Sequence, residues 1–118
     1  MPWTVEVTAE AEGEIKELPA DLQAKFLHVS GLIEKFGPEK VHEPHVKHLE
    51  GKLWEIRMRG KDGIARAIYF TTAGRRALVV RVFTKKTQQT PRREIDLATE
   101  RMRQLTSELG RKNRKRKP

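Results

Sequence analysis

The chain has 118 residues, of which 36% are hydrophobic and 35% are charged, and this length suffices for one compact domain. It has no cysteine, which excludes disulfide bonds and Cys-ligated metal sites, and no apolar run approaches the roughly 20 residues that a membrane helix needs. The net charge of +9 predicts a polyanionic partner, nucleic acid before membrane, because no amphipathic membrane-binding helix accompanies the charge.

The N-terminal part of the sequence predicts one strand and two helices. Residues 3–7 alternate apolar and polar side chains with the period of a strand, and residues 9–18 form a short helical stretch. Over residues 21–36 the apolar side chains recur at intervals of three and four, which is one face of an amphipathic helix. Gly37 followed by Pro38 ends this helix. We expect the two helices to pack as an antiparallel pair.

The middle of the sequence predicts a loop and then three strands. Residues 38–50 hold two prolines and show little periodicity, so we expect a loop with at most one helical turn. Strand-like alternation follows over residues 53–59, 64–70 and 77–83, with short turns between them. Three consecutive strands joined by tight turns predict an antiparallel meander.

The end of the sequence predicts a helix and a basic tail. Thr90 and Pro91 suit the N-cap and first position of a helix, whose apolar positions again step by three and four until Gly110 stops it. The whole order predicts an α+β fold: an N-terminal strand, a helical pair, a three-stranded antiparallel meander and a C-terminal helix. We expect one domain over residues 1–110 and a flexible basic tail over residues 111–118.

Basic side chains recur on the three predicted meander strands. Neighbouring strands lie about 4.8 Å apart, so their side chains can converge on one nucleotide. The residues concerned are Arg57, Arg59, Arg66, Arg81, Lys85 and Lys86. We interpret them as a cationic groove, since like charges on adjacent strands repel each other without an anion. The alternative is that these arginines solvate an exposed face or pair with Glu55 or Asp62. Tyr69 stacks on a base at the rim if a bulge turns it to the arginine face, and otherwise belongs to the core.

Three histidines with the spacing H-x2-H-x2-H precede the first meander strand. His42, His45 and His48 have a spacing that metal ligands can adopt, but Pro44 breaks helical geometry and no carboxylate or cysteine completes the set. We therefore expect no metal and no cofactor. His45 or His48 could instead carry a proton beside the groove.

Three motifs resemble one protein family. They are LEGKLWEIR (49–57), ARAIYF (65–70) and FTKKTQQTPRREIDLA (83–98). In their order and spacing they resemble the HigB-like branch of the RelE/ParE toxin superfamily, over most of residues 3–109. The resemblance implies a RelE-like fold and a cytoplasmic toxin of a type II toxin–antitoxin system. Such toxins are metal-independent endoribonucleases that cleave mRNA on the ribosome, without a small-molecule cofactor, and a helix-turn-helix antitoxin neutralises them.

The resemblance also implies roles for individual residues. Arg57 and Arg66 would clamp the phosphate, while Lys85 and Lys86 would stabilise the transition state, one of them as acid or base. RNA-binding roles would fall to Arg59, Arg81, Tyr69, His48 and Thr87. Two other functions stay open at this point. One is a ParE-like inhibitor that binds gyrase, and the other is a nucleic-acid-binding module without activity.

Overall fold

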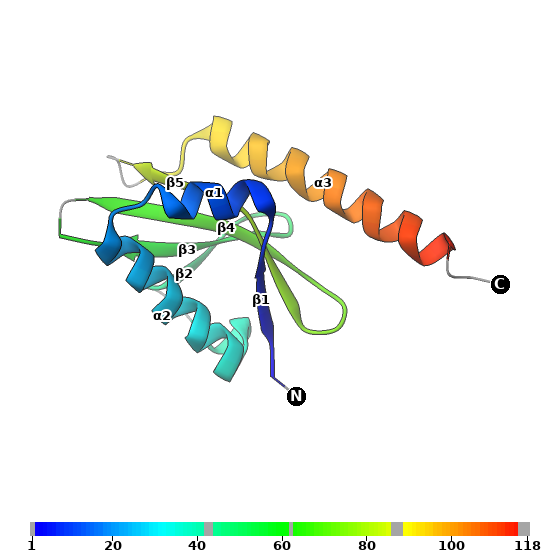
Figure 1. Ribbon diagram of the computed structural model, residues 1–118, viewed down its shortest axis with the longest axis horizontal. Coiled ribbons are helices and arrows are strands. Elements are labelled where there is room, and N and C mark those ends of the chain that lie inside the picture. Colours follow the sequence, from blue (N-terminus) through cyan, green and yellow to red (C-terminus); the bar gives the residue numbers. More distant parts are fainter. Residues whose placement is uncertain (1, 42–43, 62, 86–88, 116–118) are drawn as a thin grey trace.

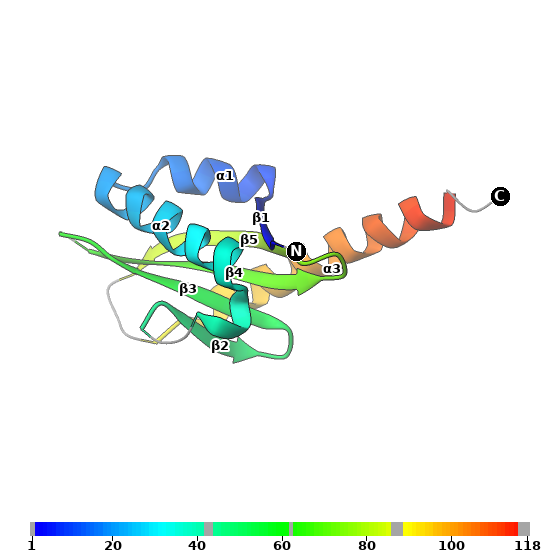
Figure 2. The same cartoon turned by 90° about the horizontal axis from the view of Figure 1, so that it is seen from below.

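A five-stranded mixed sheet lies between a helical pair and one long helix (Figures 1 and 2). The computed structural model describes residues 2–41, 44–61, 63–85 and 89–115, with side chains as far as residue 108. The elements in chain order are β1 (Thr4–Val7), α1 (Ala9–Lys16), α2 (Ala20–Phe36), the 3₁₀ helix η1 (Pro38–Lys40), β2 (Val46–Glu50), β3 (Leu53–Arg59), β4 (Ile64–Thr72), β5 (Arg76–Lys85) and α3 (Arg92–Lys115).

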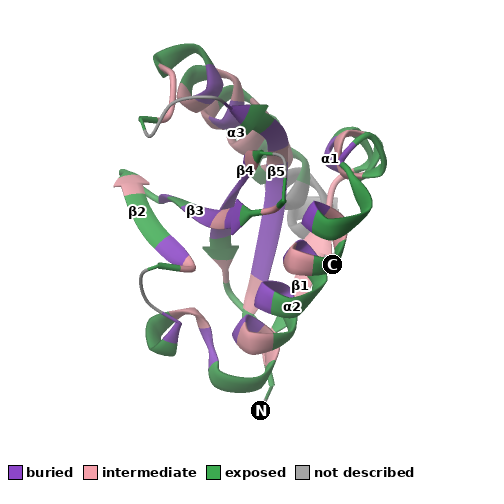
Figure 3. Ribbon diagram, turned by 90° about the vertical axis from the view of Figure 1, so that its left-hand side faces the viewer, coloured by how far each residue is buried: buried purple, intermediate pink, exposed green. Residues whose placement is uncertain are grey.

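The strands follow the order β1-β5-β4-β3-β2, with β1 parallel to β5 and the other neighbours antiparallel. Burial is deepest on the inner strands β4 and β5 and low on the edge strands β1 and β2 (Figure 3). This agrees with the strongly apolar sequence of β5, which predicts a strand covered on both faces.

Each face of the sheet has its own apolar core. On one face α1 and α2 pack on alternate strand residues, among them Ile56, Met58 and Val79. On the other face α3 packs through Ala98 on a smaller core that includes Ile68. Within the described part of the chain, no helix is both long and apolar enough to cross a membrane.

Tyr69 belongs to the first core. Its side chain is 1% exposed, and burial raises the pKa of its hydroxyl. The ladder does shift here, since Ile68 pairs with Arg81 but Tyr69 pairs with Val79, so β5 has one extra residue. The bulge does not bring Tyr69 to the arginine face, and the predicted stacking on a base was wrong. The alternative prediction, a core residue, is the one observed.

The two helices after β1 and the three-stranded meander were predicted correctly, but β2 was missed. α1 packs on β5 and α2 mainly on β3, and their packing on each other as an antiparallel pair stays a prediction. Pro44 and the histidines hid β2, and only Val46 of the strand is buried, so no alternation marks it in the sequence. The predicted loop over 38–50 therefore contains a fourth meander strand, paired with β3. By contrast, Gly37 ends α2 as predicted, with φ of 85° and its N–H bonded to the carbonyl of Ile33.

The bounds of α3 also differ from the prediction. The helix begins at Arg92, and the N–H groups of Glu94 and Ile95 donate to the carbonyl of Pro91. It continues through Gly110 to Lys115 and extends beyond the body of the molecule (Figure 1). A glycine inside a helix costs only about 1 kcal/mol relative to alanine, so it does not by itself end one. That the last residues form a flexible tail stays a prediction.

Candidate functional site

Charged side chains gather on the face of the sheet that α3 partly covers. On β3, Glu55 and Arg57 alternate with core residues and therefore point to this face. In the strand register Arg57 is opposite Arg66 of β4, and one row further Ile64 is opposite Lys85 of β5. The prediction that basic residues of neighbouring strands meet is confirmed for these three. We call Glu55, Arg57, Arg66 and Lys85 the charge cluster.

The charge cluster is largely buried, which is unusual for ionisable groups. Glu55, Arg66 and Lys85 are 2%, 3% and 8% exposed. Oε1 of Glu55 lies 3.4 Å from Nε of Arg66 and 3.9 Å from Nε of Arg57. Its other oxygen, Oε2, accepts a hydrogen bond of 2.6 Å from the hydroxyl of Thr90. One buried carboxylate thus faces two guanidinium groups and the segment that leads into α3.

Burial and neighbouring cations disfavour the charged forms of the basic residues. The pKa of Lys85 falls from 10.5 to about 8, mainly through burial and then through the charge of Arg66, while Glu55 acts in the opposite direction. The pKa of Arg66 is also lowered by burial, an effect that Glu55 opposes. At pH 7 roughly one Lys85 side chain in ten is therefore in the neutral, unprotonated form. A neutral lysine beside fixed cations can accept a proton.

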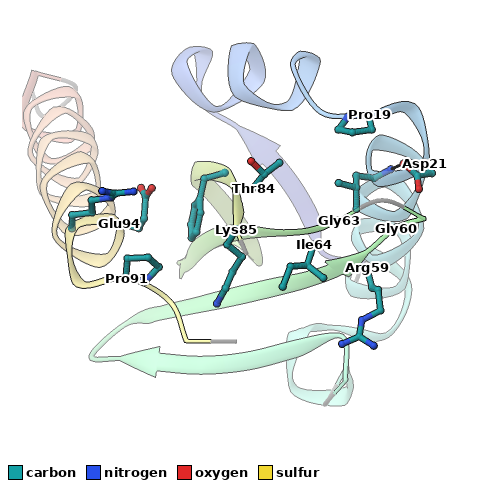
Figure 4. A pocket seen from close by; sticks show the side chains of 13 residues that line it. Pro19, Asp21, Arg59, Gly60, Gly63, Ile64, Thr84, Lys85, Pro91 and Glu94 are labelled. Atoms are coloured by element: carbon teal, nitrogen blue, oxygen red, sulfur yellow. Dashed lines mark hydrogen bonds between the residues drawn. The ribbon is translucent and has the colours of Figure 1, made fainter. Parts of the chain in front are cut away.

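Three hollows surround the charge cluster. The first, of about 930 Å³, lies at the end of the sheet and has Lys85, Arg59 and Pro91 among its walls (Figure 4). The second, of about 630 Å³, is lined by Glu55 and Arg57 together with other residues. The third, of about 380 Å³, is lined by Arg57, Arg59 and Arg66. The cluster is therefore reached from several sides, as a site for an extended polymer requires.

A family model identifies the chain. The model described as "Phage derived protein Gp49-like (DUF891)" matches residues 13–103. The chain belongs to this family. No curated protein matches the Gp49-like chain significantly.

Two solved structures have a similar fold. One is the archaeal RelE–RelB complex from Pyrococcus horikoshii, with a TM-score of 0.55 and 22% identity, covering 71% of the Gp49-like chain and 96% of the other. The second is a mutant of the Escherichia coli toxin RelE in the free state, with a TM-score of 0.63 and 14% identity, covering 86% and 98%. At these identities the likeness shows the fold, and the predicted RelE-like α+β fold is confirmed.

Arg81 is the clearest departure from the predicted groove of the Gp49-like chain. Its guanidinium donates to Glu94 of α3 at 2.7 Å and to Glu14 of α1 at 2.6 Å. Arg101 of α3 donates to the same Glu14 carboxylate at 3.0 Å and to the carbonyl of Val80 at 2.8 Å. The bond to Glu94 and the charge of these carboxylates raise the pKa of Arg81. Arg81 therefore joins α1, β5 and α3, and its role in binding RNA stays a prediction.

His48 lies on the edge strand β2, opposite Trp54 and not opposite Glu55, but it lines the second hollow together with Glu55 and Arg57. It pairs with Trp54, their rings lie 4.7 Å apart, and its Nε2 lies 2.8 Å from the carbonyl of Gly51. Lys47, which no motif had singled out, is the β2 residue opposite Glu55. It was missed because β2 was missed.

The remaining predicted residues divide into two groups. Arg59 is exposed and lines two of the hollows beside the charge cluster. Lys86, Thr87, His42 and Asp62 lie outside the described residues. Among the residues that the structure describes, no three histidine or carboxylate side chains are grouped as metal ligands.

The pairing of strand arginines with Glu55, which was the alternative to an open groove, is observed for Arg57 and Arg66. Thr90 was predicted as the N-cap, but α3 begins two residues later, at Arg92. Glu55 is the centre of the charge cluster, and the Thr90 hydroxyl donates to it. The signal for Glu55 was its position two residues before Arg57, which places both side chains on one face of a strand.

Proposed function

We propose that this chain is the toxin of a type II toxin–antitoxin system, of the HigB-like branch, and that it is an endoribonuclease acting on mRNA. The observation that carries the proposal is the meeting of Arg57, Arg66 and Lys85 around one buried carboxylate on an accessible face of the sheet. Like charges placed side by side raise the free energy of the folded protein. Such destabilising groups of cations are common in sites that act on anions.

RNA brings its own nucleophile to such a site. The 2′-oxygen attacks the neighbouring phosphorus, and the bond from phosphorus to the 5′-oxygen breaks. The products are a 2′,3′-cyclic phosphate and a 5′-hydroxyl end. The neutral amine of Lys85 takes the proton of the 2′-hydroxyl, and solvent gives a proton to the leaving 5′-oxygen. The base and the phosphate contacts therefore come from residues of the protein, the acid comes from solvent, and the proposed steps use no bound metal.

Arg57 and Arg66 hold the phosphate and stabilise the charge that develops on it. A guanidinium presents several N–H donors in one plane and matches the oxygens of a phosphate. The two arginines lie opposite each other on adjacent strands, so they can hold two oxygens of one phosphate. Donors fixed in this way before the reaction are typically the largest contribution to stabilising a transition state.

An antitoxin is the expected protein partner. One solved structure with this fold is described as a RelE–RelB complex, and the exposed cationic side chains beside the cluster favour an acidic partner segment. We propose a helix-turn-helix antitoxin, and we propose that the toxin acts in the cytoplasm on messages bound to ribosomes. Growth inhibition should disappear when the antitoxin is expressed from the same plasmid.

The test is a map of RNA 5′ ends after brief expression, followed by cleavage with purified protein, with and without ribosomes and with a metal chelator. We expect new 5′-hydroxyl ends, and loss of them with Lys85→Met or Arg57→Gln. Arg76→Gln is the matched control, because Arg76 lies at the other end of β5 and pairs with Glu6. Intact messages in arrested cells that show DNA damage would instead indicate a gyrase inhibitor and contradict the proposal.

A further inference from the structure

Glu55 has an unusual position for a group that no step of the proposed reaction uses. It is 2% exposed, yet it lies among the groups that would touch the RNA. A buried carboxylate is stable only when cations and hydrogen bonds compensate for its lost hydration. Its negative charge repels a phosphate, and its oxygens already have three partners, so it is unsuited to touching the phosphate itself.

The two oxygens of Glu55 have separate partners. Oε2 accepts from the Thr90 hydroxyl at 2.6 Å, in the segment immediately before α3. Oε1 faces Nε of Arg66 at 3.4 Å and Nε of Arg57 at 3.9 Å. One oxygen therefore fixes the carboxylate, and the other faces both guanidinium groups.

We propose that Glu55, fixed by Thr90, is a positioning residue that orients Arg57 and Arg66 and balances the charge around Lys85. This inference rests on the proposed ribonuclease function, and it goes beyond it by assigning roles to two residues that do not react. It also makes the segment before α3 part of the site.

The surroundings of Lys85 indicate which charge matters. The charged groups of the sheet that act on it are Glu55, Arg57, Arg66 and Lys47. The charged groups that share the first hollow with it are Asp21, Arg59, Arg93 and Glu94. Glu94 is held by Arg81, and Asp21 accepts from the backbone N–H groups of Leu22 and Lys61. Of the described carboxylates, Glu55 is the one whose charge raises the pKa of Lys85.

The variant Glu55→Gln tests the inference directly. The amide keeps the size of the side chain and an oxygen for Thr90, but it removes the negative charge. The pKa of Lys85, followed by NMR of its side chain in the purified protein, should fall by about one unit. The pH at which cleavage reaches half its maximum should fall with it, and the maximal rate should drop about tenfold or more, because the arginines lose their orientation.

A second variant covers the case in which Glu55→Gln does not fold. Thr90→Val removes the hydroxyl and keeps the shape, so it should also move the NMR titration of Lys85 and slow cleavage, and Thr90→Ser should restore both. The matched controls are Glu50→Gln, an exposed carboxylate bonded to Arg92, and Thr99→Val, whose hydroxyl donates to a carbonyl within α3. Neither control should move the titration of Lys85.

The outcomes separate the two proposals. If the wild-type protein cuts no RNA and does not arrest translation, the proposed function is wrong. If the wild-type protein cuts RNA but neither Glu55→Gln nor Thr90→Val changes the pH profile or the Lys85 titration, the positioning role is wrong and the ribonuclease remains. A loss of stability with an unchanged pH profile would also overturn the inference, since it would show a purely structural role.

Discussion

Replacing Lys85 by methionine should make the protein more stable and inactive at the same time. Lys85 is 8% exposed, and its pKa of about 8 in the folded protein is below the ordinary value of 10.5. A lysine whose pKa falls on folding binds protons more tightly in the unfolded chain. Its burial therefore costs free energy at neutral pH, and this cost disappears as the pH rises from about 8 toward 10.5.

The size of the effect follows from the shift in pKa. At pH 7 the shift of Lys85 corresponds to a cost of about 3 kcal/mol, and at pH 9.5 about 1.4 kcal/mol of it remains. Methionine has a similar length and no charge, so Lys85→Met should raise the free energy of unfolding by about 2–3 kcal/mol at pH 7. The gain should shrink by about 2 kcal/mol at pH 9.5.

Urea unfolding of both proteins at pH 7 and pH 9.5 measures this difference. Groups common to both proteins cancel in the comparison. Lys52→Met is the control, since Lys52 is exposed in the turn between β2 and β3 and should change stability by less than about 0.5 kcal/mol. The reasoning is refuted if Lys85→Met is no more stable than the wild type, or if the difference in stability does not depend on pH. Either result would show that burying Lys85 does not destabilise the folded protein.

Three further predictions concern the packing and the charge of the molecule. Gly60→Ala should lower the free energy of unfolding by about 1–3 kcal/mol, because the new Cβ would lie 2.5 Å from Oδ2 of Asp21. Gly63→Ala, in the same hairpin, places its Cβ in open space and should leave the stability in urea nearly unchanged. Glu14→Gln should lower the free energy of unfolding by about 2–4 kcal/mol, since it removes the negative charge that the guanidinium groups of Arg81 and Arg101 share. The control Glu12→Gln, at an exposed carboxylate, should lower it by less than about 0.5 kcal/mol, and equal losses would contradict this reasoning. Binding to a non-cleavable RNA should weaken steeply as salt is raised from 50 to 200 mM in a fluorescence titration, and an affinity independent of salt would exclude a cationic site.

The periodicity of the sequence was enough to predict most of the fold. Elements with a buried face, such as α2 and β5, repeat their apolar residues with the period of their structure, so the pattern and the packing have one cause. β2 lacks this pattern because Val46 is its one buried residue. Its extended conformation is stabilised by pairing with β3 and not by an apolar face of its own. A strand placed by its neighbour cannot be found from its own residues.

The site was partly predictable for a related reason. Strand alternation places Arg57, Arg66 and Lys85 on one face, so their meeting could be inferred without coordinates. The ion pairs of Arg81 could not be inferred in this way, because Glu14 and Glu94 lie on helices on different sides of the sheet. Contacts between elements that are distant in sequence depend on tertiary packing, and no local pattern records them.

The composition of the charge cluster matches the charge changes of the proposed reaction. Before the reaction, Arg57 and Arg66 contribute two positive charges, Glu55 contributes one negative charge, and a neutral Lys85 contributes none, which leaves one positive charge to meet the single negative charge of a phosphodiester. When the 2′-oxygen has attacked, the phosphorus carries two negative charges, and Lys85, having taken the proton, adds a second positive charge. The site is thus balanced both before the reaction and at the transition state. Without Glu55 the free site would carry an excess of positive charge that favours binding the substrate over converting it, and only interactions that strengthen at the transition state increase the rate.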